Sequence, residues 1–343
     1  MQYGISLSLA RIPIARSMEL ARLAESCGFG TVSVGEAAHD SFATAAAMAT
    51  STATIRLMTG VTTWVRPPVL TAIGAATVDE ISGGRFTLGL GTMPEHWNRD
   101  HYGIDPVRPV QRMEEFVKVI RQTLAATPGV PVDHAGERFT IRGYRRVAAV
   151  GRSDIPIVLA ATRPAMARLA GRIGNGVYCN VIATADGIRN DILPAIARGR
   201  AEAASGDDEV RPFERFLLLR CCIDDDESQA WERLRESLRM YLGVPYLVDV
   251  ASAAGFDVQP SVALARNGHF DAAVEAIPMA LVQQMGVAGT VEQCRTQLRR
   301  YDGLIDTIVF APPSGLSADE GCEQISRIVS ADWTTPLVGA HAS

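Results

Sequence analysis

Three stretches of the sequence place side chains capable of chemistry next to segments that could hold them rigidly. The first is GEAAHDSF, residues 35–42, where Glu36, His39 and Asp40 stand between a predicted strand at 31–34 and a predicted helix that starts at Phe42. An imidazole can exchange a proton near neutral pH, which suits His39 to acid–base work at the rim of a ligand site. The structural alternative is a helix cap, because Asp40 or Ser41 could accept a hydrogen bond from the first helical turn. The stretch alone leaves both interpretations of His39 open.

The other two stretches are rich in small residues. SGGRFTLGLGTMPEHW, residues 82–97, begins with turn glycines, whereas Gly89 and Gly91 lie near the end of a predicted strand, where a missing side chain lets a planar ligand or a phosphate approach the backbone. LAATRPAMARLAGRIGNGV, residues 159–177, starts a predicted helix at Pro164, so that backbone N–H groups at the helix start could hold an anion. Each pattern is short and weak by itself.

Other chemistries have less support in the sequence. It contains no GxSxG elbow and no cysteine beside a suitable histidine, so nucleophilic acyl transfer is disfavoured. His96 with Asp100 or His101 could form part of a metal site, but Pro94 and the loop composition argue against a rigid pair, and we predict no metal. The six cysteines form no CxxC pair and are expected to be reduced thiols of the core.

The elements that must position these residues alternate between short apolar strands and amphipathic helices. This βαβ repetition predicts parallel strands joined by crossover helices. Eight such units favour a single closed α/β barrel of the (β/α)8 TIM type over a doubly wound sheet, with ligand chemistry at the strand ends. We expect one domain over 1–335, with insertions at about 92–108, 128–146 and 243–285, and a C-terminal tail at 336–343. The predicted strands are 3–9, 31–34, 55–63, 85–90, 155–160, 177–180, 216–223 and 305–310.

Composition excludes some classes of partner. The formal net charge is −5, and no segment of the sequence contains a cluster of arginine and lysine residues. Nucleic acid is therefore not expected as a partner. No apolar run reaches the roughly 18 residues of a membrane span, and the first residues do not have the pattern of a secretory signal. We therefore expect a cytoplasmic protein that acts on a small molecule.

Taken jointly, the order and spacing of four segments resemble the luciferase-like flavin and deazaflavin oxidoreductases. The similarity is with the branch that includes methylenetetrahydromethanopterin reductase and the glucose-6-phosphate dehydrogenase dependent on coenzyme F420, and it covers most of 1–180 plus 289–312. This resemblance implies a (β/α)8 barrel with a deazaflavin or flavin across its C-terminal mouth, and a homodimer packed through the early helices. The segments are GEAAHDSFATAAAMATSTATIRLMTGV, RPPVLTAIGAATVDEISGGRFTLGLGT, PIVLAATRPAMARLAGRIGNGV and GTVEQCRTQLRRY.

The resemblance also implies roles for individual residues. His39 occupies the position of the family's proton-handling histidine, and Glu95 lies one residue beyond the position of its partner acid, where this chain has Pro94. In another sub-branch Asp40 matches the functional position, and His39 would then be incidental. The strand that ends near Thr62 is expected to carry a bulge with a non-prolyl cis peptide at Gly60-Val61, and Trp64 and Trp97 are expected to line the substrate pocket. The predicted cofactor-binding residues are Asp40, Gly60, Val61, Thr62, Gly91, Thr92, Met93, Ala161, Thr162, Arg163, Ala165, Met166, Gly174, Asn175 and Gly176.

Three functions remain open at this stage. The first is an oxidoreductase that transfers a hydride between coenzyme F420 and a small imine, enone or carbonyl compound. The second is a monooxygenase that uses reduced flavin mononucleotide (FMN) and O2, with a partner flavin reductase. The third is a binding protein that has lost catalysis. The absence of a lysine cluster argues against a sugar phosphate as substrate. We expect the insertion at 243–285 to determine substrate specificity.

Overall fold

The computed structural model describes residues 1–8, 12–36, 39–206 and 211–333. Its contacts divide the chain into two compact units. Unit 1 comprises Met1–Gly30, Cys179–Leu193 and Arg215–Ser343, and unit 2 comprises Thr31–Tyr178 and Pro194–Glu214. The predicted domain boundary at 335 and the tail at 336–343 lie outside the described residues, so these two assignments stay predictions.

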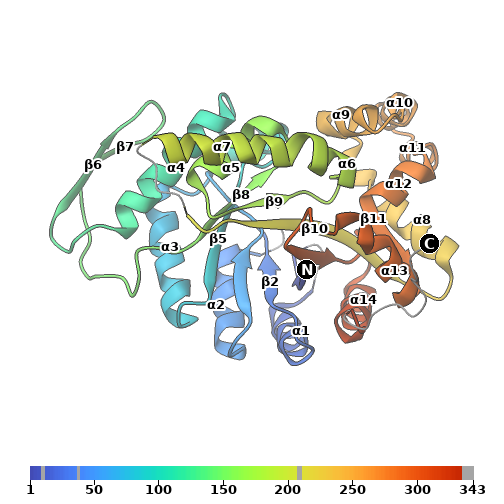
Figure 1. Ribbon diagram of the computed structural model, residues 1–343, viewed down its shortest axis with the longest axis horizontal. Helices are drawn as coiled ribbons and strands as arrows, with labels where there is room; N and C mark the ends of the chain where they lie inside the picture. Colours follow the sequence, from blue (N-terminus) through green and yellow to red (C-terminus); the bar gives the residue numbers. More distant parts are fainter. Residues whose placement is uncertain (9–11, 37–38, 207–210, 334–343) are drawn as a thin grey trace. The chain divides into compact units, whose positions relative to one another are not determined.

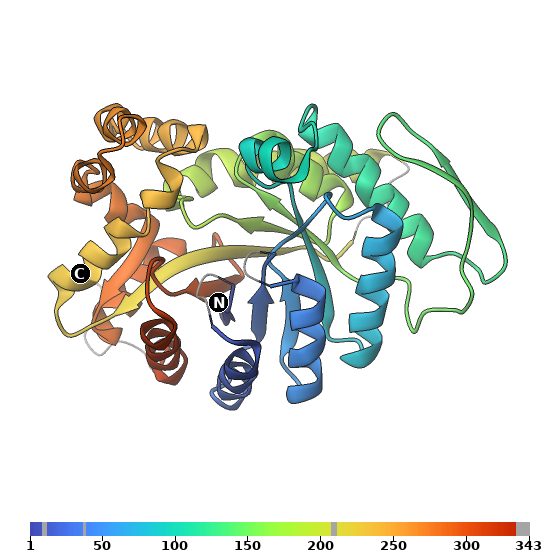
Figure 2. The same cartoon turned by 180° about the vertical axis from the view of Figure 1, so that it is seen from behind.

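Unit 2 contains a parallel sheet in the strand order β2-β3-β5-β8-β9 (Figure 1). Every residue of β2, β5 and β9 is buried, as expected for strands covered on both faces. Helices follow the strands along the chain, and α2 and α3 pack side by side in both views (Figures 1 and 2). The strands are β2 (Thr31–Val34), β3 (Arg56–Thr59), β4 (Thr62–Thr63), β5 (Phe86–Gly91), β8 (Ile157–Ala161) and β9 (Gly176–Cys179); the helices are α2 (Ser41–Ser51), α3 (Pro68–Ile81), α4 (Pro109–Leu124), α5 (Pro164–Ile173) and α7 (Leu193–Ser205).

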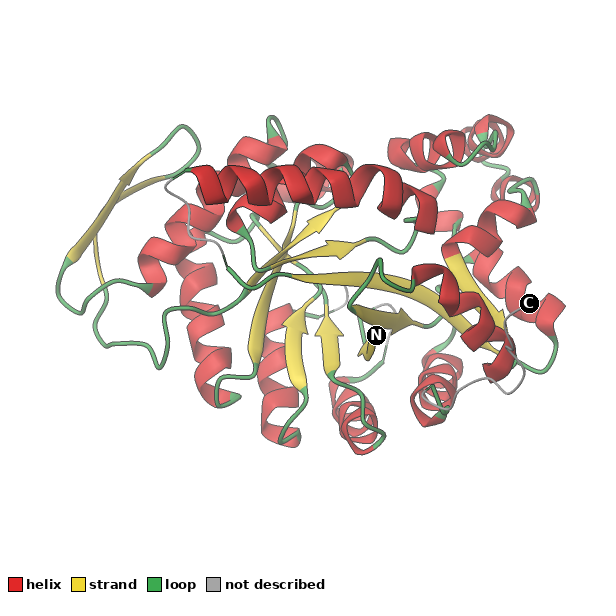
Figure 3. Ribbon diagram, in the orientation of Figure 1, coloured by secondary structure: helices red, strands yellow, loops and turns green. Residues whose placement is uncertain are grey.

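The excursion at 128–146 is a two-stranded antiparallel hairpin made of β6 (Pro131–Ala135) and β7 (Thr140–Arg145) (Figure 3). A single carboxylate on α4 anchors it. Glu115 accepts hydrogen bonds from the backbone N–H groups of Arg138 (3.0 Å) and Phe139 (2.8 Å), and lies 3.1 Å from Nε2 of His134. These hydrogen bonds outweigh the effect of burial and lower the pKa of Glu115.

Unit 1 contains a parallel sheet in the order β11-β10-β12-β1. The sequence did not predict β11, which consists of four small residues directly after the insertion. Helices α1 and α14 pack against each other, as the reverse view shows (Figure 2). The strands are β1 (Gln2–Ser6), β10 (Glu214–Ile223), β11 (Gly286–Gly289) and β12 (Thr307–Ala311); the helices include α1 (Ile14–Ser26), α6 (Ala185–Gly187), α8 (Glu227–Glu236), α13 (Val291–Leu298) and α14 (Ala318–Ser330).

The insertion at 243–285 is helical, as predicted, and has an apolar core of its own. Leu247 and Leu281 are fully buried and join Trp231 and Leu234 of α8 in one cluster. Tyr246 and Phe256 also pack against this cluster, which places them in the insertion's core. Four helices form it: α9 (Pro245–Ala253), α10 (Gln259–Arg266), α11 (Phe270–Glu275) and α12 (Met279–Met285). Within the described part of the chain, no helix is both long and apolar enough to cross a bilayer.

Candidate active site

The carboxyl ends of the unit 2 strands lie along one edge of the sheet, because the strands are parallel. Val34 of β2 pairs with Thr59 of β3, and Thr63 of β4 pairs with Gly91 of β5. Leu90 of β5 then pairs with Leu159 of β8. The segments that follow β2, β4, β5 and β8 are therefore neighbours, with about 4.8 Å between successive strands. This edge brings together most of the residues that the sequence singled out.

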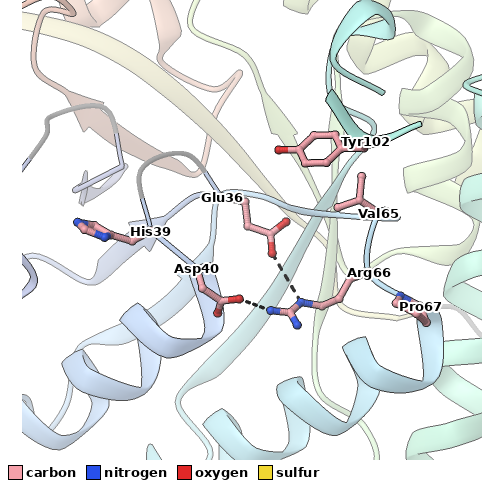
Figure 4. Close-up of a pocket in the computed structure, with 7 residues that line it drawn as sticks. All are labelled: Glu36, His39, Asp40, Val65, Arg66, Pro67 and Tyr102. Carbon is pink, nitrogen blue, oxygen red and sulfur yellow. Dashed lines mark hydrogen bonds and ion pairs between the residues drawn. The ribbon is translucent and has the colours of Figure 1, made fainter. Parts of the chain in front are cut away.

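An open pocket of about 470 Å³ lies at this edge, beside the ends of β2 and β4 (Figure 4). Its lining combines two carboxylates, an imidazole, a guanidinium and a phenol. Such side chains can accept, donate and hold protons and can stabilise charge. The lining residues are Glu36, His39, Asp40, Val65, Arg66, Pro67 and Tyr102.

Arg66 joins the two carboxylates of the pocket. Its guanidinium forms an ion pair with Asp40, and its Nε lies 3.7 Å from Oε1 of Glu36 (Figure 4). Glu36 also accepts hydrogen bonds from the backbone N–H of Thr63 (3.2 Å) and from the hydroxyl of Ser41 (3.3 Å). Arg66 and Glu36 were not assigned a role from the sequence, because their partners are distant along the chain. Together they fix the relative position of the segments after β2 and β4.

Asp40 has the capping role that the sequence allowed. Its side chain accepts a hydrogen bond of 2.8 Å from the backbone N–H of Ala43, in the first turn of α2. Burial acts to raise the pKa of Asp40, but the Ala43 hydrogen bond and the Arg66 guanidinium outweigh it and lower the pKa. Asp40 is therefore a carboxylate at neutral pH, and its predicted contact with a cofactor stays a prediction.

His39 lines the pocket from the opposite side. Its side chain is exposed, and its imidazole points away from the Arg66 guanidinium (Figure 4). Tyr102, from the segment after β5, lies above Glu36 and Val65 (Figure 4). The pocket thus has a charged wall at Arg66 and an exposed imidazole at its rim, and the proton-handling role of His39 stays a prediction.

The break in the third strand is a bulge, as the resemblance implied. The Gly60-Val61 peptide is cis, which confirms that prediction. β3 pairs with β5 up to Met58 and Thr87, and β4 resumes the pairing at Thr62 and Leu90, so three residues on one strand face two on the other. The hydroxyl of Thr59 fills the gap in the ladder, since it both donates to the carbonyl and accepts from the N–H of Gly89 (both 2.8 Å).

The two glycines of β5 leave the space that the bulge occupies. A Cβ atom at Gly89 would overlap the carbonyl oxygen of Thr59, and one at Gly91 would overlap Cγ2 of Val61. The expectation that Gly89 and Gly91 leave room for a ligand is thus corrected: the space beside them is filled by the bulged strand. Likewise a Cβ at Gly60 would overlap the hydroxyl of Ser33.

Asn98 organises the segment after β5, although no local pattern in the sequence marks it. The residue is fully buried, and its Oδ1 accepts a 2.7 Å hydrogen bond from the indole N–H of Trp64. Its Nδ2 donates to the carbonyl oxygens of Thr92 (2.7 Å) and Pro94 (3.1 Å). Trp64 is only 2% exposed and is not part of the pocket lining; it holds this segment in place. Met93, which adjoins Thr92, has a left-handed backbone with φ of 57°.

Glu95 and Trp97 lie beyond this anchored turn. The Glu95 side chain is 71% exposed and forms an ion pair with Arg99, and it does not line the pocket. Trp97 is half-buried at the start of a π-helix, Trp97–His101, and its ring stacks on His101 with centroids 5.7 Å apart. Their assignments as partner acid and as pocket wall stay predictions.

Two groups of predicted cofactor-binding residues lie at the carboxyl ends of the unit 2 strands, which we call the ligand edge. Thr62 is fully buried, and its hydroxyl has no hydrogen-bond partner among the described residues. Thr162, Arg163 and Ala165 are exposed where α5 begins, and this start has no side-chain cap. Ala161 ends β8, and Met166 is buried in the first turn of α5. The uncapped N–H groups and the Arg163 guanidinium suit an anion.

The third predicted group lies at the other edge of the sheet. Gly174 and Asn175 precede β9 and Gly176 is its first residue, so all three lie at the amino ends of the strands, opposite to the edge that carries Thr62 and Thr162. The Asn175 side chain accepts hydrogen bonds from the N–H of Ile157 (3.0 Å) and from Arg121 (3.1 Å). That these three residues bind the cofactor stays a prediction. They form the turn into β9 and tie it to the start of β8.

The sequence is similar to known proteins over most of its length. The sequence profile of the luciferase-like monooxygenase family matches residues 1–307. A protein of Mycobacterium tuberculosis, provisionally named a coenzyme F420-dependent oxidoreductase, is 30% identical over 84% of this chain and 88% of its own length. The 5,10-methylenetetrahydromethanopterin reductase of Archaeoglobus fulgidus is 31% identical over 99% of this chain and 93% of its own. An F420-dependent glucose-6-phosphate dehydrogenase of Rhodococcus erythropolis is 29% identical over 68% of this chain and 72% of its own.

The fold has solved counterparts. The coenzyme F420-dependent tetrahydromethanopterin reductase of Methanopyrus kandleri superposes with a TM-score of 0.78, at 23% identity, over 95% of this chain and 97% of that one. The monooxygenase RslO1 of Streptomyces bottropensis superposes with a TM-score of 0.67, at 22% identity, over 96% and 98% of the two chains. The predicted (β/α)8 barrel with insertions is thereby confirmed.

The fold is a (β/α)8 barrel, and the carboxyl ends of the unit 2 strands carry acid–base side chains. The chain belongs to the luciferase-like monooxygenase family, and it is an enzyme of the oxidoreductase class.

Proposed function

We propose that this enzyme transfers a hydride between coenzyme F420 and a small organic electrophile such as an imine, an enone or a carbonyl compound. The observation that carries the proposal is the pocket at the ligand edge, whose lining offers Glu36, His39, Arg66 and Tyr102 but no serine or cysteine nucleophile. Such a lining suits a reaction in which a cofactor does the redox chemistry and the protein moves a proton. Relatives named for F420 match over most of the chain, which supports the same cofactor here.

The residues present fit a deazaflavin with an anionic tail. The hydroxyl of Thr62 is buried and unpaired among the described residues, so it can bond a polar ring atom. The uncapped start of α5 and the Arg163 guanidinium can hold a phosphate. Three strand spacings separate the segments after β2 and β8, about 15 Å, which suits an elongated ligand. When bound, the coenzyme would supply hydride transfer at its C5 atom.

The protein's own part in the reaction is to hold the pocket and move the proton. Arg66 keeps Glu36 and Asp40 in place as a charged wall. His39 is exposed at the rim of the pocket, and its imidazole points away from that wall. We assign to His39 the transfer of the proton. Tyr102 lies over the pocket and can shield it from water.

Cofactor choice is tested by titrating the purified protein with oxidised F420 and, separately, with FMN, and following fluorescence quenching. We expect micromolar binding of F420. Micromolar binding of FMN alone would refute the proposal and support the flavin-dependent monooxygenase, with its need for a partner reductase. Binding of neither would support a protein that has lost catalysis.

Arg163→Met tests the proposed anion site, which consists of the uncapped start of α5 and the Arg163 guanidinium. A charge-assisted hydrogen bond is worth about 1.5–3 kcal/mol, so we expect F420 to bind about tenfold more weakly or worse. The matched control is Arg168→Met, on the same helix, because Arg168 is exposed and pairs with Glu202. Equal affinities in the two variants would contradict the placement of the phosphate.

We also propose a homodimer that packs through α3. Leu70, Ile73 and Ile81 lie on the exposed side of this helix and are 47%, 39% and 44% exposed. Three large apolar side chains on one helix face form the kind of patch that a partner surface covers. Ile73→Glu should convert a dimer to a monomer in light scattering after size exclusion, and a wild-type monomer would exclude the proposal.

A further inference from the structure

Arg220, on β10 of unit 1, is a buried arginine without an acidic partner. The residue is 3% exposed. In the described ranges 1–8, 12–36, 39–206 and 211–333, no carboxylate forms an ion pair with it. Other arginines of unit 1 are paired, such as Arg215 with Asp306 and Arg233 with Asp224 (3.0 Å). Arg220 is therefore a buried cation whose charge is balanced by no carboxylate among the described residues.

The groups that contact Arg220 are neutral. Its Nη1 donates a 2.6 Å hydrogen bond to the carbonyl of Pro312, and its Nη2 donates to the hydroxyl of Ser314 and lies 3.8 Å from the sulfur of Met240. Nearby, burial raises the pKa of Tyr241, while the charge of Arg220 and a hydrogen bond with Asn180 oppose that rise. These contacts fix the guanidinium but supply no negative charge.

Such a cation is costly unless it meets an anion. Removing a charge from water is strongly unfavourable, and an apolar side chain of similar length would pack in the same space without that cost. A guanidinium presents a planar set of N–H donors that matches the oxygens of a carboxylate or a phosphate. The arrangement therefore suits an oxyanion that comes from outside the chain.

One side of Arg220 is covered by an exposed side chain. Met240 is 47% exposed, its sulfur lies 3.8 Å from Nη2 of Arg220, and an unbranched methionine can change its rotamer at little cost, which would uncover this side of the guanidinium. Ser314 is half-buried and held by the hydroxyl of Ser237, which accepts from its backbone N–H (2.8 Å).

We propose that Arg220, together with Ser314 and Tyr241, binds an oxyanion, a carboxylate or a phosphate, carried by the substrate. The assignment of this oxyanion to the substrate rests on the proposed function. The binding of an oxyanion at Arg220 does not, and it can be measured without coenzyme.

The test uses the full chain at constant ionic strength and three probes: sodium benzoate, inorganic phosphate and benzamide, the neutral counterpart of benzoate. Binding is measured by calorimetry and by the shift of the thermal midpoint. We expect saturable binding of benzoate or phosphate and none of benzamide. The oxyanion that binds more tightly identifies a carboxylate or a phosphate as the substrate group.

Variants then locate the site. Truncating one partner of a buried charge pair weakens binding by about 30-fold or more, which we expect for Arg220→Met. Arg220→Lys should restore part of the affinity, because it restores the charge but not the planar donor set. Arg327→Met is the matched control, since Arg327 is a surface residue paired with Glu323 and its loss changes the net charge equally. It should bind like wild type.

Several results would overturn the inference. They are equal response of wild type to benzoate and benzamide, no binding of either oxyanion, or an Arg220→Met variant that binds like wild type. If Arg220→Met does not fold, Tyr241→Phe replaces it, with an expected severalfold loss of affinity; unchanged affinity there would refute the site. A parallel F420 titration separates the two proposals, because F420 binding without oxyanion binding refutes only this one, and the reverse refutes only the proposed function.

Discussion

Removing the side chain of Asn98 should destabilise the protein and loosen the backbone of Thr92 and Met93, which is predicted to bind the cofactor. In Asn98→Ala the buried indole N–H of Trp64 and the half-buried carbonyl of Thr92 lose these partners. The carbonyl of Pro94 keeps a hydrogen bond from the backbone N–H of residue 98 (3.2 Å). The orphaned indole N–H costs about 1–3 kcal/mol, and the half-buried carbonyl costs less because water can reach it, so we expect a loss of about 2–3 kcal/mol.

The assay is urea unfolding followed by circular dichroism, with Asn190→Ala as control. Asn190 is exposed, so its replacement should change the free energy of unfolding by less than about 0.5 kcal/mol. Trp64→Phe removes the indole donor, and a double-mutant cycle with Asn98→Ala should show a coupling of about 1–2 kcal/mol. F420 affinity should fall severalfold in Asn98→Ala, because the Thr92 and Met93 backbone is no longer held. A loss below 1 kcal/mol together with zero coupling would refute the reasoning.

Three further predictions follow from the structure. Gly89→Ala should cost about 3 kcal/mol or more in urea unfolding, because its Cβ meets the Thr59 backbone, while Gly151→Ala, in open space, should be neutral; similar values for both would contradict the close packing. The lowered pKa of Glu115 means that its stabilisation is present above the ordinary glutamate pKa of 4.5 and is lost as pH falls through the folded value, so Glu115→Gln should flatten the decline of stability below pH 4.5; an unchanged slope would argue against this anchor. His39→Ala should lower kcat while F420 affinity stays nearly intact, and weaker binding at unchanged turnover would refute its proton role.

Local patterns predicted much of the fold. The strands of unit 2 are short runs rich in apolar residues, and the turn Ser82-Gly83-Gly84 follows from glycines that adopt φ of 65° and 85°. Asp40 could be identified as a cap because capping depends on a residue and the turn beside it. β11 was missed because GVAG is too short to show a period, and its burial depends on β10, which lies more than 60 residues earlier.

The site was harder to predict because its contacts join distant segments. Arg66 meets a carboxylate 26 positions away, and Asn98 meets an indole 34 positions away, so no local pattern marks either residue. The edge at which Gly174 and its neighbours lie could not be predicted, because a glycine-rich turn looks alike at either end of a strand. Only the course of β8 and β9 shows which edge it occupies.

The bulge separates the length of the third strand from that of its neighbour. Three residues stand between Met58 and Thr62 but only two between Thr87 and Leu90, so Thr62 keeps its partner on β5 although its own strand is one residue longer. Deletion of one residue between Thr59 and Thr62 would leave two residues facing two, which fits a regular ladder with Thr62 still opposite Leu90. Such a deletion would remove the bulge while leaving β4 in register, and it would therefore separate the contribution of the bulge from that of the residues that follow it.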